Sequence, residues 1–282
     1  MLESPWGTSD LESEAHVEAA TQRSGQQAGD AADAQGVRSI RRALDILSLL
    51  TDDKPVVSVR DITDATGLPK TTVLRLVHTL EQSGLLWATA GGFMAGPGLW
   101  RWAYLARRSW QLPPETQATM RDLGAKHQET VNLYVLRDIC RVCVAQQESP
   151  RALRHVVQVG DGLPLWGGAS SKVLLSDAPE ALLARVASRS PVGPEHLETL
   201  RQWAADTRRD GYAVSHGERE EGISAVAVPV TGRSGTVTAA LALSGPTLRF
   251  TADRVTQFAA DLKLAAVRMS ERGFDHPLGP AT

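Results

Sequence analysis

The segment that follows Pro69 places basic and hydrogen-bonding side chains on one side of a predicted helix. At about 100° per residue, Thr71, Arg75, His78 and Gln82 cluster opposite an apolar stripe. Their guanidinium, imidazole, hydroxyl and amide groups can contact base edges and phosphates in a major groove, and no carboxylate interrupts them. The pattern predicts contact with DNA. The alternative is an ordinary solvated face on a small helical domain.

Lys70 and the two threonines after it begin this helix, where free backbone N–H groups and the helix dipole favour a phosphate. Arg41 and its basic neighbours lie on the polar side of an earlier helix, predicted over 37–50. These arginines either contact phosphates or remain solvated, and both interpretations stay open. The predicted DNA-contacting residues are Lys70, Thr71, Thr72, Arg75, His78, Gln82 and Arg41.

Helical periodicity and turn residues predict the elements that hold this face. Ser58 begins a short helix with Asp61 as its capping-box acid, and Gly67 ends it. A hairpin is predicted over 85–95. Short helices joined by a tight turn and followed by a hairpin indicate a winged helix-turn-helix. The apolar stripes are Val37, Ile40, Leu44, Leu47 and Leu50 in the first helix, and Val73, Leu76, Val77 and Leu80 in the third.

The net charge of −2 is unevenly distributed. Residues 37–110 hold ten basic and six acidic residues, whereas residues 1–36 hold one basic and seven acidic residues. Residues 111–282 hold nineteen of each. A basic block between an acidic leader and a neutral remainder favours a polyanionic partner for that block. The leader has almost no β-branched or aromatic residues, which predicts disorder.

Helices and strands alternate irregularly after residue 97, without repeated βαβ units, which indicates an α+β domain. The predicted organisation is a disordered leader (1–36), a winged domain (37–96), a helical linker (97–112), an α+β domain (113–272) and a tail (273–282). Helices are predicted over 99–109, 115–128, 168–176, 179–188, 194–209 and 251–271. Strands are predicted over 131–136, 141–147, 153–159, 212–216, 223–230 and 236–243.

Composition and motifs exclude several classes of protein. The chain has no apolar run of about 20 residues and no secretory signal pattern, so no membrane segment is expected. Two cysteines in 282 residues fit a reducing compartment, and the cytoplasm is the expected location. Cys140 and Cys143 lie three apart on a predicted strand and so face opposite sides. No P-loop, nucleophile elbow or metal-ligand spacing appears, and neither a cofactor, a metal nor catalysis is predicted.

Several separated motifs resemble those of the IclR-type bacterial transcriptional regulators. The run over 37–47 is similar to the opening helix of that family, and the run over 67–76 is similar to its recognition helix. The later similarities cover 163–165, 168–175, 208–212, Glu218 together with 222–230, 243–246 and 249–251. The resemblance extends over about residues 37–271. It implies a GAF-like α+β effector domain, a double-stranded DNA operator and a homodimer or homotetramer.

The resemblance also places an effector pocket. Hydroxyls, a histidine and backbone N–H groups near Ala169, set among apolar walls, suit a small organic or aromatic acid. Each residue alone is equally compatible with packing or capping, and Trp166 either stacks on a ligand ring or belongs to the core. The wing over 89–93 departs from expectation because it lacks a basic residue. The positions that the resemblance assigns to the effector pocket are His155, Trp166, Ala169, Ser170, Ser215, Ile223, Ala225, Ala242 and Ser244.

Large rings gather on the predicted linker: Trp100, Trp102, Tyr104 and Trp110. They are interpreted as a dimer contact, and the alternative is that they pack the linker against its own domain. An effector that prefers one dimer geometry would shift the DNA-competent population by its differential affinity. An alternative function is a small-molecule sensor whose winged domain binds protein, and a third is an enzyme that uses the second domain.

Overall fold

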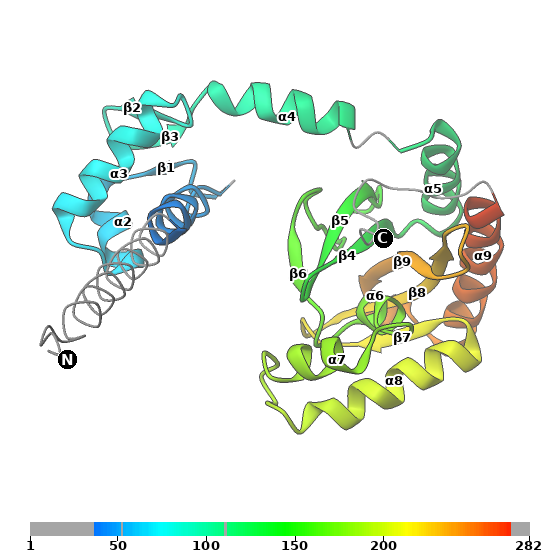
Figure 1. Cartoon of the computed structure of the whole chain (residues 1–282). Coiled ribbons are helices and arrows are strands. Elements are labelled where there is room, and N and C mark those ends of the chain that lie inside the picture. The colour runs from blue at the N-terminus through cyan, green and yellow to red at the C-terminus, as the bar shows by residue number, and fades with distance from the viewer. Residues whose placement is uncertain (1–36, 52, 110–111, 272–282) are drawn as a thin grey trace, which may run out of the picture. The chain divides into compact units, whose positions relative to one another are not determined.

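The computed structural model describes residues 37–51, 53–109 and 112–271 of the 282-residue chain. The predicted leader, Trp110 and the predicted tail lie outside the described residues. The chain divides into two compact units between Arg107 and Arg108, each with its own elements (Figure 1). Among the described residues, no helix is long and apolar enough to cross a bilayer.

The N-terminal unit is a small helical bundle with a three-stranded antiparallel sheet of order β1-β3-β2. Its hydrophobic core includes Ile46, Ile62, Val73, Val77 and Leu86, all nearly inaccessible to solvent. Strand β1 was not predicted, and it pairs with β3. The elements are a helix over 37–47, β1 (Val56–Val57), α2 (Val59–Thr66), α3 (Lys70–Gln82), β2 (Leu86–Thr89), β3 (Gly92–Ala95) and α4 (Gly98–Ser109).

Local sequence signals set the turn between α2 and α3. The Ser58 side chain accepts the Asp61 N–H at 3.1 Å, and the Asp61 carboxylate accepts the Ser58 N–H at 2.8 Å. This reciprocal pair confirms the predicted capping box. Gly67 ends α2 with a φ of 66°, a left-handed conformation that glycine adopts without steric cost. Helix α3 therefore begins at a defined angle to α2.

The first helix packs differently from the prediction. Val37, Ile40 and Leu44 are 57%, 65% and 56% exposed, whereas Ile46 is completely buried. The helix ends at residue 47 rather than 50 and buries the side that carries Ile46. The prediction that the stripe from Val37 to Leu50 faces the core of this chain is therefore wrong for its first three members. Periodicity identified an apolar face, but other residues meet the core.

The C-terminal unit is built around a six-stranded antiparallel sheet of order β6-β5-β4-β9-β8-β7. A short 3-10 helix, Thr247–Arg249, links β9 to the last helix. This arrangement agrees with the predicted α+β class. The elements are α5 (Pro114–His127), β4 (Thr130–Arg137), β5 (Cys140–Gln147), β6 (Gly162–Pro164), α6 (Ala169–Leu174), α7 (Glu180–Ala187), α8 (His196–Asp210), β7 (Ala213–His216), β8 (Ile223–Thr231), β9 (Val237–Pro246) and α9 (Ala252–Glu271).

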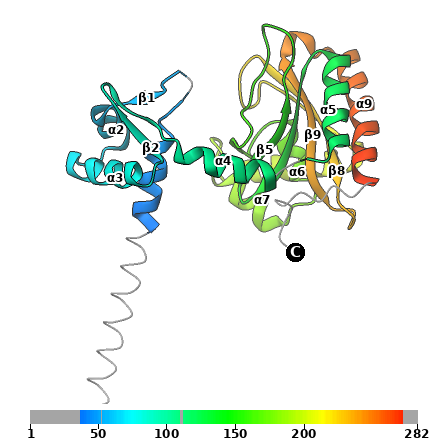
Figure 2. The same cartoon turned by 90° about the horizontal axis from the view of Figure 1, so that it is seen from above.

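Side-chain size differs between the two faces of this sheet. Along β9, Leu241 and Leu243 join the core formed with α5 and α9, whereas Ala240 and Ala242 join the core formed with α6, α7 and α8. Helices α5 and α9 lie side by side on their face in both views (Figures 1 and 2). The alternation of successive side chains across a strand produces this division. Small residues on the α6 face leave space next to that helix.

Two predictions in this unit need correction. The strand predicted over 153–159 does not form, although His155 and Val157 are buried and alternate with exposed neighbours. This segment has the burial pattern of a strand, but β6 at Gly162–Pro164 takes the place beside β5. On α9, helical periodicity predicts an apolar face with Phe258, Leu262, Leu264 and Val267 among its members. Leu264 is 65% and Val267 is 54% exposed, so these two side chains face outward instead.

A buried ion pair joins β4 to the 3-10 helix. Glu129 is completely buried, and Arg249 donates to both of its carboxylate oxygens, at 2.5 and 2.7 Å. Arg249 also donates to the Leu153 carbonyl at 3.1 Å. Loss of the guanidinium would leave a carboxylate in the protein interior without a counter-charge, which is strongly unfavourable.

We therefore expect Arg249→Ala to lower the free energy of unfolding of the C-terminal unit by about 3–5 kcal/mol. Urea unfolding of the full chain, followed by circular dichroism, measures this change. The matched control is Arg201→Ala, which removes an arginine from a solvent-exposed pair with Glu180 and should change little. Equal shifts of the two unfolding midpoints would contradict the assigned importance of the Glu129–Arg249 pair.

Candidate functional site

The outward face of α3 is the first candidate site. Lys70, Thr71, Arg75, His78 and Gln82 are exposed, and Val73, Val77 and Leu80 on the opposite side are buried. Thr72 is half-buried at the start of the helix, and Arg41 is exposed on the first helix. The structure thus places the predicted contact residues of α3 together on a solvent-facing side, with Thr72 at its margin. Glu81 is the carboxylate on α3, and it lies near the end of the helix.

Leu74 was missed by the sequence analysis. It is 45% exposed and lies one helical turn from both Thr71 and His78. An apolar side chain at such a place can contact the C5-methyl group of thymine. Its position on the helical wheel, at the edge of the polar face, is a usable signal, but leucine has no charged or hydrogen-bonding group that would mark it as a DNA contact.

The wing is apolar rather than basic. The turn between β2 and β3 is held by the Thr89 hydroxyl, which donates to the Gly92 carbonyl at 3.0 Å. Trp87 and Met94 are 58% and 39% exposed, and with Trp100 they line a hollow of about 350 Å³. The wing therefore offers apolar surface rather than cations. Exposed basic side chains of this unit lie on α3, on the first helix and, with Arg60, on α2.

A cavity beside α6 is the second candidate site. Its volume is about 40 Å³, close to the space of a single water molecule. Eight of the nine effector positions predicted from the family resemblance line this cavity. They are His155, Ala169, Ser170, Ser215, Ile223, Ala225, Ala242 and Ser244. Residues from β8, β9, α6, β7 and the 148–161 loop are thus brought together at one place.

Trp166, the ninth predicted position, does not line this cavity. It is half-buried and packs against the hydrophobic cluster around α6. The lining also contains residues that the sequence analysis missed, most of them charged. Most of them lie in a loop of charged residues or on a strand, and no local sequence pattern indicated that their side chains line a cavity. These residues are Tyr134, Arg141, Gly168, Glu218, Arg219 and Glu220.

A chain of hydrogen bonds orients Ser244 on the cavity wall. Gln146 donates to the Asn132 side-chain oxygen at 3.0 Å, so the Asn132 amide nitrogen donates to Ser244 Oγ, also at 3.0 Å. The Arg219 guanidinium has only donors, so His155 Nε2 accepts the hydrogen bond of 3.3 Å between them. The ring hydrogen of neutral His155 is then on Nδ1, which donates to Ser244 Oγ at 3.0 Å. Ser244 Oγ thus accepts two bonds, and its own hydrogen remains available to an acceptor.

Burial determines the protonation states around the cavity. It lowers the pKa of His155, which keeps the imidazole neutral at neutral pH and agrees with the hydrogen bonds described above. Burial also lowers the pKa of Arg141 to about 10, where the guanidinium remains charged. It raises the pKa of Tyr134, whose phenol stays protonated. The walls of the cavity therefore carry Arg141 as a buried cation and neutral hydrogen-bonding groups, next to the charged loop residues Glu218, Arg219 and Glu220.

Arg141, one of the two buried cations near the cavity, is only partly compensated. Arg141 is 5% exposed, and its Nη1 donates to the carbonyls of Pro164 and Gly167 at 2.9 and 2.8 Å. Its Nε is buried and has no hydrogen-bond acceptor among the described residues. Lys172 Nζ donates to the Val214 carbonyl at 2.9 Å and to Glu218 Oε1 at 2.5 Å. Such an environment favours an anion.

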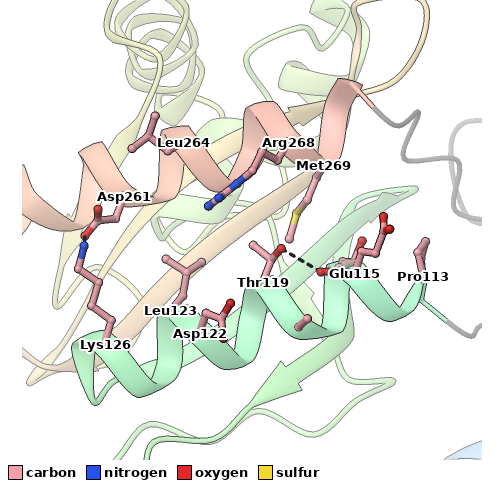
Figure 3. A pocket seen from close by; sticks show the side chains of 12 residues that line it. Pro113, Glu115, Thr119, Asp122, Leu123, Lys126, Asp261, Leu264, Arg268 and Met269 are labelled. Atoms are coloured by element: carbon pink, nitrogen blue, oxygen red, sulfur yellow. Dashed lines mark hydrogen bonds and ion pairs between the residues drawn. The ribbon is translucent and has the colours of Figure 1, made fainter.

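A larger groove of about 800 Å³ lies between α5 and α9 (Figure 3). Its walls carry an ion pair of 2.7 Å between Lys126 and Asp261, together with Leu264 and Met269. None of the predicted effector positions lies in it. The cavity beside α6 is much smaller, but it contains the buried cation and the converging hydroxyls, so it is the better candidate for recognition of a small polar molecule.

Cys140 and Cys143 lie on β5 as free thiols. Burial raises the pKa of Cys143 to about 12, which keeps its thiol protonated. Within the described ranges, no group of three or more His, Cys, Asp or Glu side chains is arranged to hold a metal ion.

Comparison with known proteins identifies both units. The model of the IclR helix-turn-helix domain matches residues 39–87, and the model of the bacterial transcriptional regulator IclR C-terminal domain matches residues 106–271. The chain belongs to the IclR family of bacterial transcriptional regulators. It is therefore a DNA-binding regulator with an N-terminal helix-turn-helix and a C-terminal effector domain, as the motif resemblance implied.

Individual IclR-family relatives agree with this assignment. The chain is 32% identical over 236 residues to a probable transcriptional regulator, SauR, of Cupriavidus necator, covering 81% of this chain and 94% of SauR. It is 28% identical to the transcriptional repressor IclR of Escherichia coli, covering 82% and 88%. A crystal structure of an IclR-family regulator from Rhodococcus sp. is 44% identical, with a TM-score of 0.58, and covers 84% of this chain and 94% of that one.

Proposed function

We propose that α3 of this IclR-family regulator reads an operator in the major groove. The observation that carries the proposal is the exposed α3 face, which presents Arg75, His78 and Gln82 with no carboxylate among them. Arg75 is the candidate for bidentate contact with guanine, and Lys70, Thr71 and Thr72 are candidates for phosphate contacts at the start of the helix. Arg41 adds a phosphate contact from the first helix. Such a regulator acts where the DNA is, in the cytoplasm.

We further propose that the cavity beside α6 binds a small organic or aromatic acid. Arg141 supplies a buried positive charge, and Ser244 keeps a free hydroxyl hydrogen for an acceptor. Ala225 and Ala242 add apolar wall. A few polar groups that converge in a mostly apolar setting are typical of small-molecule sites, and a carboxylate is the ligand group that matches these donors.

We infer that the regulator works as a homodimer or a larger homo-oligomer. Trp100, Trp102 and Tyr104 are 79%, 61% and 59% exposed on α4. In the same unit, the first helix exposes Val37, Ile40 and Leu44. Apolar surface of this extent on a DNA-binding unit fits contact with a second copy, because two half-sites are read by two copies. The linker helix α4 would then help to set the distance between the DNA-binding units of the two copies.

Effector control follows from linkage between the two sites. An acid that binds one oligomer geometry more tightly than another shifts the DNA-competent population by the ratio of its two affinities. The strands and helix around the cavity belong to the C-terminal unit, and the linker joins that unit to the DNA-binding one. A change in the cavity can therefore alter operator affinity without any contact between effector and DNA.

For the DNA interface, we expect Arg75→Ala to weaken specific binding by about 1–3 kcal/mol, because a bidentate base contact is lost. Arg75→Lys should bind scrambled DNA as the wild type does, because the positive charge is kept. It should lose the preference for the operator over scrambled DNA, since lysine lacks the planar fork of arginine. Fluorescence anisotropy at fixed salt measures both, with a duplex selected by the wild-type protein from a random pool. Unchanged specific affinity of Arg75→Ala, or binding that does not weaken with salt, would refute the interface.

For the effector cavity, we expect carboxylates such as pyruvate or benzoate to raise the melting temperature of the full chain, whereas their neutral amides should not. Ser244→Ala should weaken acid binding by about tenfold or more, because a hydrogen bond to a charged group is lost. Ser188→Ala, which removes a surface hydroxyl on another helix, is the control. If no acid stabilises the wild-type protein, or if Ser244→Ala binds acids equally well, the cavity assignment is wrong.

For the oligomer, we expect the double variant Trp100→Ala/Trp102→Ala to raise the dissociation constant of self-association at least tenfold, because two exposed rings of the proposed contact are removed. Analytical ultracentrifugation across a dilution series measures it. Leu248→Ala removes an even more exposed apolar residue (91% exposed) from the C-terminal unit and should have no effect. An unchanged constant in the double variant would exclude α4 from the contact.

A further inference from the structure

The cavity beside α6 is too small for the acid that we propose it binds. A volume of about 40 Å³ holds about one water molecule, whereas an organic acid of three carbons has at least two oxygens besides its carbon atoms. A wall must therefore move before an effector enters. The walls formed by Ala169, Ala242 and Ser244 belong to buried elements and are fixed by the core. Two loops complete the wall: the 148–161 loop, which is anchored there by the buried His155 and its 3.0 Å hydrogen bond to Ser244, and the loop between β7 and β8, residues 217–222.

This loop is attached to the sheet through a glycine at each end. Gly217 and Gly222 have φ values of 66° and 79°, in the left-handed region that glycine adopts most readily. Gly217, Glu220, Glu221 and Gly222 are exposed, so little packing holds the loop down. Backbone hydrogen bonds fix its two ends, from the Gly217 N–H to the Ile223 carbonyl and from the Thr247 N–H to the Gly222 carbonyl, both at 2.8 Å. Between these ends, side chains of the loop reach back to the cavity wall.

Glu218 makes the main polar attachment. Its Oε2 accepts the Gly168 N–H at 3.0 Å, and its Oε1 accepts from Lys172 Nζ at 2.5 Å. Lys172 is nearly buried, and its ammonium lies 4.2 Å from the centre of the Trp203 ring. A carboxylate of the chain itself thus occupies donors that a carboxylate ligand would need.

Arg141 shows that the cationic wall is not saturated by this attachment. Its guanidinium is almost completely buried and lines the same cavity, and its Nε has no acceptor among the described residues. A buried charged donor that stays unpaired is costly, and a bound anion would remove that cost. The site therefore has one donor without an acceptor, Arg141 Nε, and two donors, Lys172 Nζ and the Gly168 N–H, whose acceptor is the Glu218 carboxylate.

We propose that Glu218 is an internal competitor of the effector, which binds by displacing it. The incoming carboxylate replaces Glu218 at Lys172 and at the Gly168 N–H, and also gives Arg141 an acceptor. The loop over 217–222 is released and opens the cavity. This proposal rests on the proposed function, namely that the cavity binds an organic acid.

Exchange of one carboxylate for another keeps the charge balance of the wall. Lys172 has an anionic partner both before and after the exchange, so neither state contains an unpaired buried ammonium. Displacement also changes the conformation of the segment that joins β7 to β8 at one edge of the sheet. Binding of a small acid is thereby converted into a rearrangement of the protein, which a site with rigid walls would not produce.

The test compares Glu218→Gln with Glu221→Gln in the full-length protein. Both variants remove one negative charge from the same loop, but Glu221 is exposed and does not line the cavity. Calorimetric titration with pyruvate and with benzoate measures affinity, with pyruvamide and benzamide as uncharged probes. We expect Glu218→Gln to bind the acids at least tenfold more tightly than the wild type. Glu221→Gln should match the wild type, and the amides should show no gain.

Each outcome separates this proposal from the proposed function. If Glu218→Gln binds the acids no more tightly than the wild type does, competition by Glu218 is refuted, whereas the proposal that the cavity binds acids still holds. Failure of every protein to bind the acids would overturn both. If Glu218→Gln does not fold, hydrogen exchange of the wild type replaces it. A saturating acid should then speed exchange of the backbone amides over 217–222, and unchanged exchange would refute displacement.

Discussion

Two cations that are kept away from water organise the C-terminal unit. Arg141 and Lys172 lie near the same small cavity, and a buried charge is tolerated only where hydrogen bonds and counter-charges surround it. Carbonyls of the 164–167 segment turn toward Arg141, and the end of β7 and the following loop supply acceptors to Lys172. The path of the chain into α6 and out of β7 is thus determined by the same groups that make the cavity attractive to an anion.

The space for this arrangement comes from side-chain size. On β9, Leu241 and Leu243 face α9 whereas Ala240 and Ala242 face α6, and Ala225 on β8 pairs with Ser244 across the ladder. A larger residue on the α6 side would fill the cavity and improve packing, but it would remove the site. The recognition surface therefore depends on residues whose main property is that they are small. Residues of this kind carry no chemical signature in a sequence.

The parts that sequence predicted well are those set by local physics. The capping box at Ser58, the turn at Gly67 and the two faces of α3 each depend on residues within a few positions of one another. The eight cavity residues were located by resemblance to family motifs, because no local pattern brings strands β7, β8 and β9 together. Glu218 was missed because a charged loop is ordinarily solvated, and its partner Lys172 is 46 positions away. Periodicity likewise indicated an apolar face on the first helix but not what covers it.

The edges of the six-stranded sheet restrict how copies of this protein can associate. Strand β6 has three residues and ends at Pro164, which has no N–H to offer a neighbouring strand. Strand β7 has four residues, and its Val214 carbonyl is occupied by Lys172. Short and partly blocked edges are the usual protection against strand addition. Intermolecular extension of the sheet, the route to fibrils, is thereby disfavoured, and copies of the chain are left to associate through helices and aromatic surface.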